Sequence, residues 1–331
     1  MIYLESSSTD PAFNLALEQF VFEQMDRRQE YFMLWQNANT VVVGKNQNTF
    51  AEVNQRAAEA RGVRVVRRLS GGGAVYHDLG NLNFTFIMDA ENAGDLDIRL
   101  FCQPIAELLR SLGVPAEVNG RNDITIEGRK FSGNSQYLRQ GRIMHHGTLM
   151  FQSDLSVVAE VLDVSADKFQ SKAAKSVRSR VTNIAPYLPE GFTLAEFKAR
   201  LLKYILKKDE VTPYVFSSEE LAAVEQIKKE RYSQWEWNYG SSPAYRVQKH
   251  RRFEGCGRID VCMNTENGTI TDLQFFGDYF GVANSAELAE LLKGTALERE
   301  SLAARISGLQ IGQYFHGLAA ADFLDLLLQS E

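Results

Sequence analysis

Apolar side chains recur along the chain with two different periods, and each period predicts a different kind of element. After Asp10-Pro11, apolar residues fall near every third or fourth position as far as Met25, which predicts a helix that Asp10 caps. Further helices are expected at residues 54–61, 101–112, 194–207, 218–232, 286–293 and 322–328.

Short apolar or alternating runs predict strands between these helices, at residues 32–35, 40–44, 63–68, 82–87 and 145–151. Two further pairs of runs flank Glu127-Gly128 and Asn267-Gly268, which predicts two hairpins, although Glu-Gly is a weaker turn signal than Asn-Gly. Strands and helices mix without a regular strand–helix–strand rhythm. We therefore expect an α+β (mixed α/β) fold with an antiparallel or mixed sheet, rather than a Rossmann fold.

A small, turn-rich stretch at residues 238–243 divides the chain. It predicts a catalytic domain of residues 1–243 and a small α+β C-terminal domain of residues 244–331. The formal net charge of −6 gives no basic field over the whole protein, so nucleic acid is not an expected partner. Three widely spread cysteines indicate a reducing compartment rather than a disulfide framework. Without a leader-like N-terminus or a bilayer-length apolar run, we expect a cytoplasmic protein with no membrane partner.

The most informative motif is the glycine triplet Gly71–Gly73, which follows a predicted strand ending in Arg67-Arg68. Consecutive glycines let the backbone approach a ligand closely, and their N–H groups can bind an anion. The arginines add charge and paired donors suited to phosphate or carboxylate. The motif is neither a Walker loop nor GxGxxG, so it does not indicate a nicotinamide cofactor. The alternative interpretation is a flexible turn beside a salt-bridging arginine pair.

Polar side chains on the first predicted hairpin form a second candidate group. Asp123 and Lys130 would lie on neighbouring strands, where the lysine could hold a phosphate and the aspartate a magnesium ion. Solvated side chains are the alternative. His145 and His146 are adjacent on a strand and should point to opposite faces, so at most one faces a cavity and zinc binding is not expected. Trp35 is either a core residue or the wall of an apolar slot.

In this order, the motifs resemble the lipoate–protein ligase A family. The resemblance rests on RRLSGGGAVYHD at residues 67–78, GRND at 120–123, Lys130-x-Ser132-Gly133, His146-Gly147-Thr148 and SVRSRVTN at 176–183. The stretch WEWNYG at residues 235–240 and the tail after it resemble the family's accessory C-terminal domain. The resemblance implies a biotin/lipoate ligase-like catalytic domain, related to class II aminoacyl-tRNA synthetase cores. It also implies an AMP-forming ligase that activates lipoate with ATP and transfers the lipoyl group to a lysine of an acceptor protein.

The resemblance further implies roles for individual residues. Lys130 and Asp123 are the implied catalytic residues, with Asp123 also a candidate Mg²⁺ ligand. Contacts to ATP are implied for Arg68, Gly73, Ala74, Val75, Tyr76, Asn122 and Lys130. Contacts to lipoate are implied for Trp35, Arg68, His77, Lys130 and His146. The basic segment, otherwise interpretable as an exposed loop, a lid or an RNA contact, matches the family's adenylate-binding loop with Lys172, Ser176, Val177, Arg178, Ser179 and Arg180.

The implied acceptors are lipoyl domains of 2-oxoacid dehydrogenase acyltransferase subunits and the glycine-cleavage H protein. One alternative is a cysteine-dependent octanoyl or lipoyl transferase of the same fold, but none of Cys102, Cys256 and Cys262 follows the His-Gly-Thr strand where its thiolate would be expected. A biotin ligase usually carries GRGRxGR where this chain has RRLSGGGAV. A non-catalytic module that binds lipoyl domains is a further alternative. The base that deprotonates the acceptor lysine is left open among Asp123, water and the adenylate phosphate.

Overall fold

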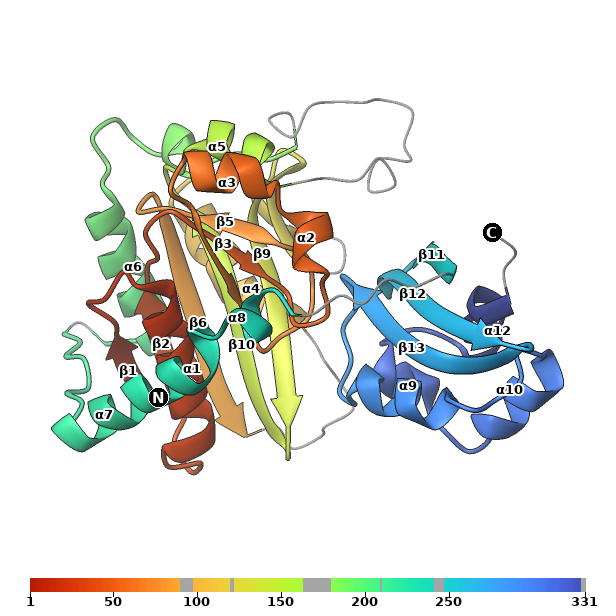
Figure 1. Cartoon of the computed structure of the whole chain (residues 1–331). Helices are drawn as coiled ribbons and strands as arrows, with labels where there is room; N and C mark the ends of the chain where they lie inside the picture. The colour runs from red at the N-terminus through yellow and green to blue at the C-terminus, as the bar shows by residue number, and fades with distance from the viewer. Residues whose placement is uncertain (90–97, 120–121, 163–179, 209, 241–246, 329–331) are drawn as a thin grey trace. The chain divides into compact units, whose positions relative to one another are not determined.

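A computed structural model of the protein describes residues 1–89, 98–119, 122–162, 180–208, 210–240 and 247–328. The chain forms two compact units (Figure 1). The first comprises Met1–Val43, Glu52–Arg68 and Ala74–Asn238, and the second comprises Gly44–Ala51, Leu69–Gly73 and Tyr239–Glu331. Two short segments of the N-terminal half thus cluster with the C-terminal residues. The predicted boundary between residues 243 and 244 lies outside the described residues.

A seven-stranded mixed sheet forms the centre of the first unit, in the order β1-β2-β6-β10-β9-β8-β7. The β1–β2 pair is parallel and the other neighbouring pairs are antiparallel. The strands are β1 (Ile2–Glu5), β2 (Tyr31–Trp35), β6 (Asn81–Asp89), β7 (Ala116–Asn119), β8 (Asp123–Ile126), β9 (Arg129–Arg139) and β10 (Arg142–Met150). A smaller sheet has the order β4-β3-β5, with β3 (Thr40–Val43), β4 (Arg64–Arg67) and β5 (Val75–His77). The predicted mixed α/β class is confirmed.

Helices α1 (Pro11–Gln24) and α4 (Ile98–Ser111) cover opposite faces of the large sheet. On β10, His146 contacts Glu18 of α1, whereas the adjacent His145 stacks on Phe101 of α4, and successive strand residues point to opposite faces. The remaining helices of this unit are α3 (Gln55–Ala60), α5 (Leu155–Val161), α6 (Leu194–Leu206), α7 (Ser218–Ile227) and α8 (Trp235–Asn238). The helix expected at 218–232 becomes a π-helical turn over Lys228–Tyr232. No helix in the described ranges is long and apolar enough to cross a bilayer.

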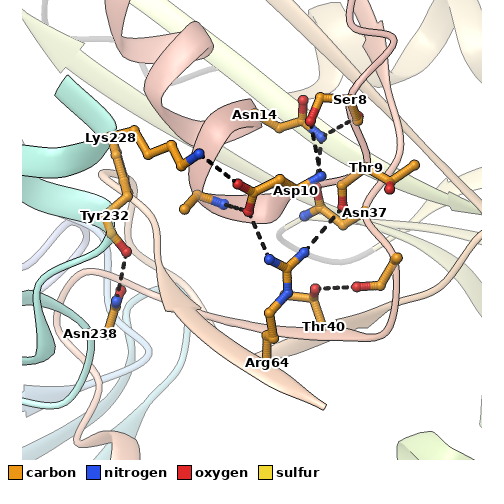
Figure 2. A network of polar contacts seen from close by, with 12 residues as sticks. Ser8, Thr9, Asp10, Asn14, Asn37, Thr40, Arg64, Lys228, Tyr232 and Asn238 are labelled. Atoms are coloured by element: carbon orange, nitrogen blue, oxygen red, sulfur yellow. Dashed lines mark hydrogen bonds and ion pairs between the residues drawn. The ribbon is translucent and has the colours of Figure 1, made fainter. Parts of the chain in front are cut away.

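The start of α1 is fixed by Asp10. Its carboxylate accepts the Ala12 N–H at 3.1 Å and pairs with Arg64 at 2.9 Å and Lys228 at 3.0 Å (Figure 2). Burial raises the pKa of Asp10, but the hydrogen bond from Lys228 and the charges of Lys228 and Arg64 outweigh it, so the pKa lies below its ordinary value. The prediction that Asp10 caps this helix is confirmed.

The turn between β8 and β9 has both central residues in the left-handed region, with φ of 52° at Glu127 and 74° at Gly128. This backbone suits a two-residue hairpin, because its twist matches that of the flanking strands. Asn267 and Gly268 adopt the same conformation between two strands of the second unit, with φ of 48° and 76°. Both predicted hairpins are therefore confirmed.

The second unit packs helices on one face of a three-stranded antiparallel sheet. Its strands are β11 (Val247–Phe253), β12 (Gly257–Glu266) and β13 (Thr269–Gly277), and its C-terminal helices are α9 (Ser285–Leu292), α10 (Arg299–Arg305), α11 (Ile311–Tyr314) and α12 (Ala320–Leu328). Helix α2 (Thr49–Glu52) spans the boundary between the two units, because Glu52 clusters with the first unit. Along β12, Ile259, Val261 and Met263 are buried and alternate with partly exposed residues. This period-two pattern gives the unit a core of its own.

Candidate functional site

A chain of buried polar contacts lies on the face of the large sheet that α1 covers. The Trp35 indole Nε1 donates to Thr85 Oγ1 at 2.9 Å, and Thr85 Oγ1 donates to Glu18 Oε1 at 2.5 Å. His146 Nδ1 lies 3.0 Å from the same carboxylate oxygen and 3.2 Å from Oε2. All four side chains are buried. Two predicted lipoate-binding residues, Trp35 and His146, are thus linked through Thr85 and Glu18.

Arg68 is buried close to this chain. Its backbone N–H donates to Val43 O at 3.0 Å and its guanidinium to Val42 O at 3.2 Å. Burial lowers the pKa of Arg68 to about 10, while the negative charge of Glu18 acts in the opposite direction. The guanidinium therefore remains charged at neutral pH and supplies a buried cation.

His77 is a neutral imidazole in the same cluster. Burial, followed by the positive charge of Arg68 and by His146, lowers the pKa of His77 to about 3. The Asn37 amide lies 3.2 Å from His77 Nδ1, and Asn37 is oriented by Asn14, whose Nδ2 donates to Asn37 Oδ1 at 2.9 Å (Figure 2). Because Nδ1 accepts this hydrogen bond, the ring proton is on Nε2. Within the described part of the chain, Nε2 is buried without a hydrogen-bond partner, so it can donate to a ligand.

The hairpin brings Lys130 and Asp123 together. Lys130 Nζ lies 2.7 Å from Asp123 Oδ1, and about a third of each side chain is exposed. A Cβ on Gly133 would lie 3.0 Å from Lys130 Nζ, so this glycine leaves room for the ammonium group. The Gly133 N–H donates to Thr148 Oγ1 at 3.0 Å. Thr148 lies on β10, two residues after His146. The hairpin group and the buried polar chain therefore occupy neighbouring strands.

Asn122 and the end of the basic segment border the hairpin. Asn122 Nδ2 donates to Asn134 O at 2.9 Å. The Lys130 N–H donates to Arg180 O at 2.7 Å, and the Thr182 N–H donates to Lys130 O at 2.9 Å, so residues 180–182 run beside Lys130. The other predicted loop residues, Lys172, Ser176, Val177, Arg178 and Ser179, lie outside the described residues, as do Gly120 and Arg121 of the second motif.

The glycine triplet belongs to the second unit. Gly72 has φ of 86°, which favours glycine, and a Cβ on Gly71 would lie 2.5 Å from the Tyr279 carbonyl oxygen. Backbone conformation and packing thus account for two of the three glycines. A Cβ on Gly73 would meet no described atom within 4 Å, so packing against described atoms does not account for this glycine.

The residues around the triplet differ in environment. Ala74 and Val75 are half-buried, whereas Tyr76 is buried and donates its hydroxyl to Asn39 Oδ1 at 3.0 Å. Burial raises the pKa of Tyr76 to about 12. The Arg67 side-chain Nε donates to Trp237 O at 2.8 Å, and the Arg67 backbone N–H donates to Asn238 Oδ1 at 2.9 Å. Arg67 thus anchors α8, and the two consecutive arginines have different partners.

Two family models match the chain. The lipoyl protein ligase A/B catalytic domain matches residues 10–206, and the bacterial lipoate protein ligase C-terminus matches residues 242–327. The chain is 42% identical to lipoate-protein ligase LplJ of Bacillus subtilis, over 99% of the chain and 100% of that protein. It is 39% identical to lipoate-protein ligase 1 of Staphylococcus aureus, over 96% and 97% respectively. The chain belongs to the lipoate–protein ligase family.

Solved structures of lipoate–protein ligases share the fold. LipL1 of P. falciparum in complex with lipoate has a TM-score of 0.80 at 23% identity, covering 99% of this chain and 98% of that one. A lipoate-protein ligase A bound with ATP has a TM-score of 0.62 at 24% identity, covering 72% and 97%. A bi-partite ligase of Thermoplasma acidophilum, described with its E2 lipoyl domain, has a TM-score of 0.62 at 26% identity, covering 74% and 98%.

The ligase family assignment agrees with the state of the cysteines. Cys102 and Cys256 are buried, and Cys262 is partly buried in the second unit. Burial, followed by the charge of Asp260, raises the pKa of Cys262 to about 11. Burial of Cys102 and Cys256 and the raised pKa of Cys262 differ from the partly exposed, low-pKa environment of an activated thiolate.

The sequence interpretation missed Glu18, Thr85 and Asn37. Glu18 lies on a helix whose positions from Asn14 to Phe22 are all buried. The helix therefore has no distinct polar face in this stretch that would tell a functional carboxylate from one on the surface. One signal was present: a carboxylate next to apolar positions of a core helix must be paired if it is buried. Thr85 and His146, which lie 67 and 128 positions from Glu18 in the sequence, supply that pairing.

Proposed function

We propose that this ligase activates lipoate with ATP to lipoyl-AMP and transfers the lipoyl group to a lysine of an acceptor protein. The observation that carries the proposal is that the first unit holds two cations, one beside the buried polar chain and one on the hairpin next to it. Arg68 is buried beside the polar chain, and Lys130 stands on the hairpin with Asp123. A mixed acyl–phosphate anhydride carries its charge on the phosphate, and two fixed cations suit it.

In the first half-reaction, a carboxylate oxygen of lipoate attacks the α-phosphorus of ATP. The new P–O bond forms as the bond to the β-phosphate oxygen breaks, and pyrophosphate leaves with that electron pair. Two negatively charged groups must approach, so catalysis depends on positioning and on neutralising charge. We assign this role to Lys130 and Arg68. Lys130 would exchange its contact with Asp123 for the substrate oxygens.

The remaining predicted residues divide between the two substrates. We assign Gly73, Ala74, Val75, Tyr76 and Asn122 to the nucleotide. The buried cluster would receive the lipoyl chain, with Trp35 and His146 against it and His77 donating from Nε2. We assign the segment ending at Arg180 to the adenylate, since residues 180–182 are hydrogen-bonded to Lys130.

Magnesium fits the donor set, because it usually takes one or two protein carboxylates together with substrate phosphates. In the described ranges no cluster of three or more His, Cys, Asp or Glu side chains could hold a metal ion alone. Asp123 would hold the ion together with the phosphates, where it supplies neutralising charge.

In the second half-reaction, the deprotonated amine of the acceptor lysine attacks the lipoyl carbonyl carbon. The amide C–N bond forms, the C–O bond to phosphate breaks, and AMP leaves with the electron pair. A free lysine has a pKa of about 10.4, so a base must take its proton. Asp123, water and the adenylate phosphate are the candidates. We propose lipoyl domains of acyltransferase subunits and the glycine-cleavage H protein as acceptors, and the cytoplasm as the location.

The proposal is tested by incubating the protein with ATP, Mg²⁺, lipoate and each candidate acceptor. Mass spectrometry should show one added lipoyl group on the acceptor lysine. Lys130→Ala should reduce modification by at least about 100-fold, whereas the exposed Lys229→Ala should match the wild type. Absence of modification together with absence of lipoate-stimulated ATP–pyrophosphate exchange would refute the ligase and favour a binding module.

A cysteine-dependent transferase would require one of the cysteines for activity, whereas the proposed ligase requires none. Replacement of Cys102, Cys256 and Cys262 by serine should leave the rate of acceptor modification within about twofold of the wild type, because no thioester is formed. Loss of modification in a variant with an unchanged circular dichroism spectrum would instead support the transferase.

A further inference from the structure

Glu18 joins several side chains of the candidate site although it carries no motif. Glu18 is 1% exposed and lies on α1 in the first unit. Burying a carboxylate is costly unless hydrogen bonds and opposite charges compensate. Among the described residues, Glu18 is compensated by hydrogen bonds with Thr85 and His146 and by the charge of Arg68. Its compensation therefore comes from the site itself rather than from the surrounding core.

The hydrogen-bond directions around Glu18 fix the proton on His146. The Thr85 hydroxyl accepts from the Trp35 indole and gives its single hydrogen to Glu18. A carboxylate beside a buried guanidinium acts as an acceptor, so His146 Nδ1 must carry the hydrogen that points to Glu18. His77 has the opposite arrangement, because its Nδ1 accepts from Asn37. The two histidines of the cluster are thus held in different tautomers.

We infer that Glu18 is a positioning residue for the acyl substrate: its carboxylate sets the tautomer of His146 directly and holds the Trp35 indole through Thr85. The inference rests on the proposed function, in which Trp35 and His146 contact the lipoyl chain. Glu18 itself touches neither nucleotide nor acceptor in this scheme. Changes at Glu18 should therefore alter the use of lipoate much more than the use of ATP.

The tautomer is tested on the full-length protein with ¹⁵N-labelled histidine, by two-bond ¹H–¹⁵N correlation at about pH 8, where unperturbed histidine is neutral. The signal of His146, assigned by its loss in His146→Gln, should show the hydrogen on Nδ1. Glu18→Gln offers an amide N–H toward Nδ1 and should move the hydrogen to Nε2. Glu23→Gln, an exposed change on the same helix, should leave the signal unchanged. A wild-type His146 with hydrogen on Nε2, or a Glu18→Gln signal identical to the wild type, would overturn the inference.

The positioning role is tested by ATP–pyrophosphate exchange. Glu18→Gln should raise the KM for lipoate by about tenfold, since a hydrogen-bond mismatch in a buried site costs on the order of one tenfold factor. The KM for ATP should stay within about twofold, and Glu23→Gln should match the wild type. Equal changes in both KM values, or an unchanged KM for lipoate, would overturn the role. A wild-type protein without lipoate-stimulated exchange would refute the proposed function, whereas the histidine signals would still decide the tautomer.

Thr85→Val provides an independent variant if Glu18→Gln does not fold. It removes the hydroxyl between Trp35 and Glu18 and keeps the branched shape of the side chain. We expect the KM for lipoate to rise by roughly threefold to tenfold, the Trp35 indole N–H signal to shift, and the His146 tautomer to stay as in the wild type. A wild-type KM for lipoate in this variant would overturn the link from Glu18 through Thr85 to Trp35.

Discussion

Two adjacent histidines on β10 have opposite environments. His145 faces α4, where its ring stacks on Phe101 with centroids 4.6 Å apart and packs near Phe84 at 5.8 Å. Burial holds the pKa of His145 well below its ordinary value. His146 faces α1 and contacts the Glu18 carboxylate. Strand alternation sends identical side chains to opposite faces of the sheet, so the face, rather than the residue type, decides which histidine stacks on an aromatic ring and which lies beside a carboxylate.

The largest expected effect is on catalysis, from a change on the face of the large sheet that α1 covers. Arg68→Lys keeps a positive charge but loses the planar fork of donors, so lipoate-stimulated ATP–pyrophosphate exchange should fall by about 100-fold. Arg142→Lys is the matched control, because Arg142 is also buried but donates to the carbonyl groups of Phe22 and Met25 at the end of α1. That control should lose stability and keep its exchange rate per folded molecule. Equal losses of exchange in both variants would remove the distinction between the arginines.

The apolar face should be sensitive to added volume. Gly147→Ala puts a Cβ 2.2 Å from Asn134 Oδ1 and 2.6 Å from Phe84 Cε1, so we expect the free energy of unfolding to fall by roughly 1–3 kcal/mol. Urea unfolding followed by circular dichroism measures the change. At Gly312 a Cβ would meet its nearest atom at 3.8 Å, and Gly312→Ala should cost nothing measurable. A Gly147→Ala variant as stable as the wild type would mean that the two faces are less tightly packed than described.

Acid should destabilise the protein through the apolar face. His145 is neutral when folded, whereas in the unfolded chain it titrates near a pKa of about 6.5. Its contribution to stability is complete above that pH and is lost as the pH falls toward the folded pKa, by about 1.4 kcal/mol per pH unit. His145→Phe removes this loss, so stability should decline by about 2 kcal/mol less between pH 6.5 and pH 5. Parallel stability curves for wild type and variant would contradict a neutral, buried His145.

The smallest effect on stability is expected at the start of α1, away from His145 and His146. Asp10→Asn retains a good N-cap but loses the ion pairs to Lys228 and Arg64, which are partly exposed, so the cost should be below about 1 kcal/mol at pH 7. Because the folded pKa of Asp10 is lowered, its extra stability is present above the ordinary carboxyl pKa and lost as the pH falls through the folded value. The difference from the wild type should therefore shrink as the pH falls below the ordinary carboxyl pKa of about 3.9. A cost above about 2 kcal/mol would show that the ion pairs fix the helix itself.

The elements with a strong period could be predicted from the sequence. The helix after Asp10 and the hairpins at Glu127-Gly128 and Asn267-Gly268 all occur, because caps and turn residues act locally. Short strands such as β1 (Ile2–Glu5) and β5 (Val75–His77) were missed, since three or four residues carry too little pattern.

The buried polar layer could not be predicted in the same way. Along β6 the polar residues Asn83 and Thr85 alternate with phenylalanines, a pattern typical of one solvated face, yet residues 81–87 are all buried because α1 covers that face. The tautomer of His77 depends on Asn37, forty positions earlier in the chain. The candidate residues were recognisable by motif, whereas their protonation and orientation depend on contacts that only the folded chain provides.

The two N-terminal segments that cluster with the C-terminal residues have a consequence for engineering. A side chain at Gly71 would collide with the Tyr279 carbonyl oxygen, and the Gly277 N–H donates to Asn46 O at 2.8 Å. A graft that exchanged residues 239–331 alone between relatives would separate Gly44–Ala51 and Leu69–Gly73 from the residues with which they pack. Successful chimaeras should therefore carry three stretches of sequence together.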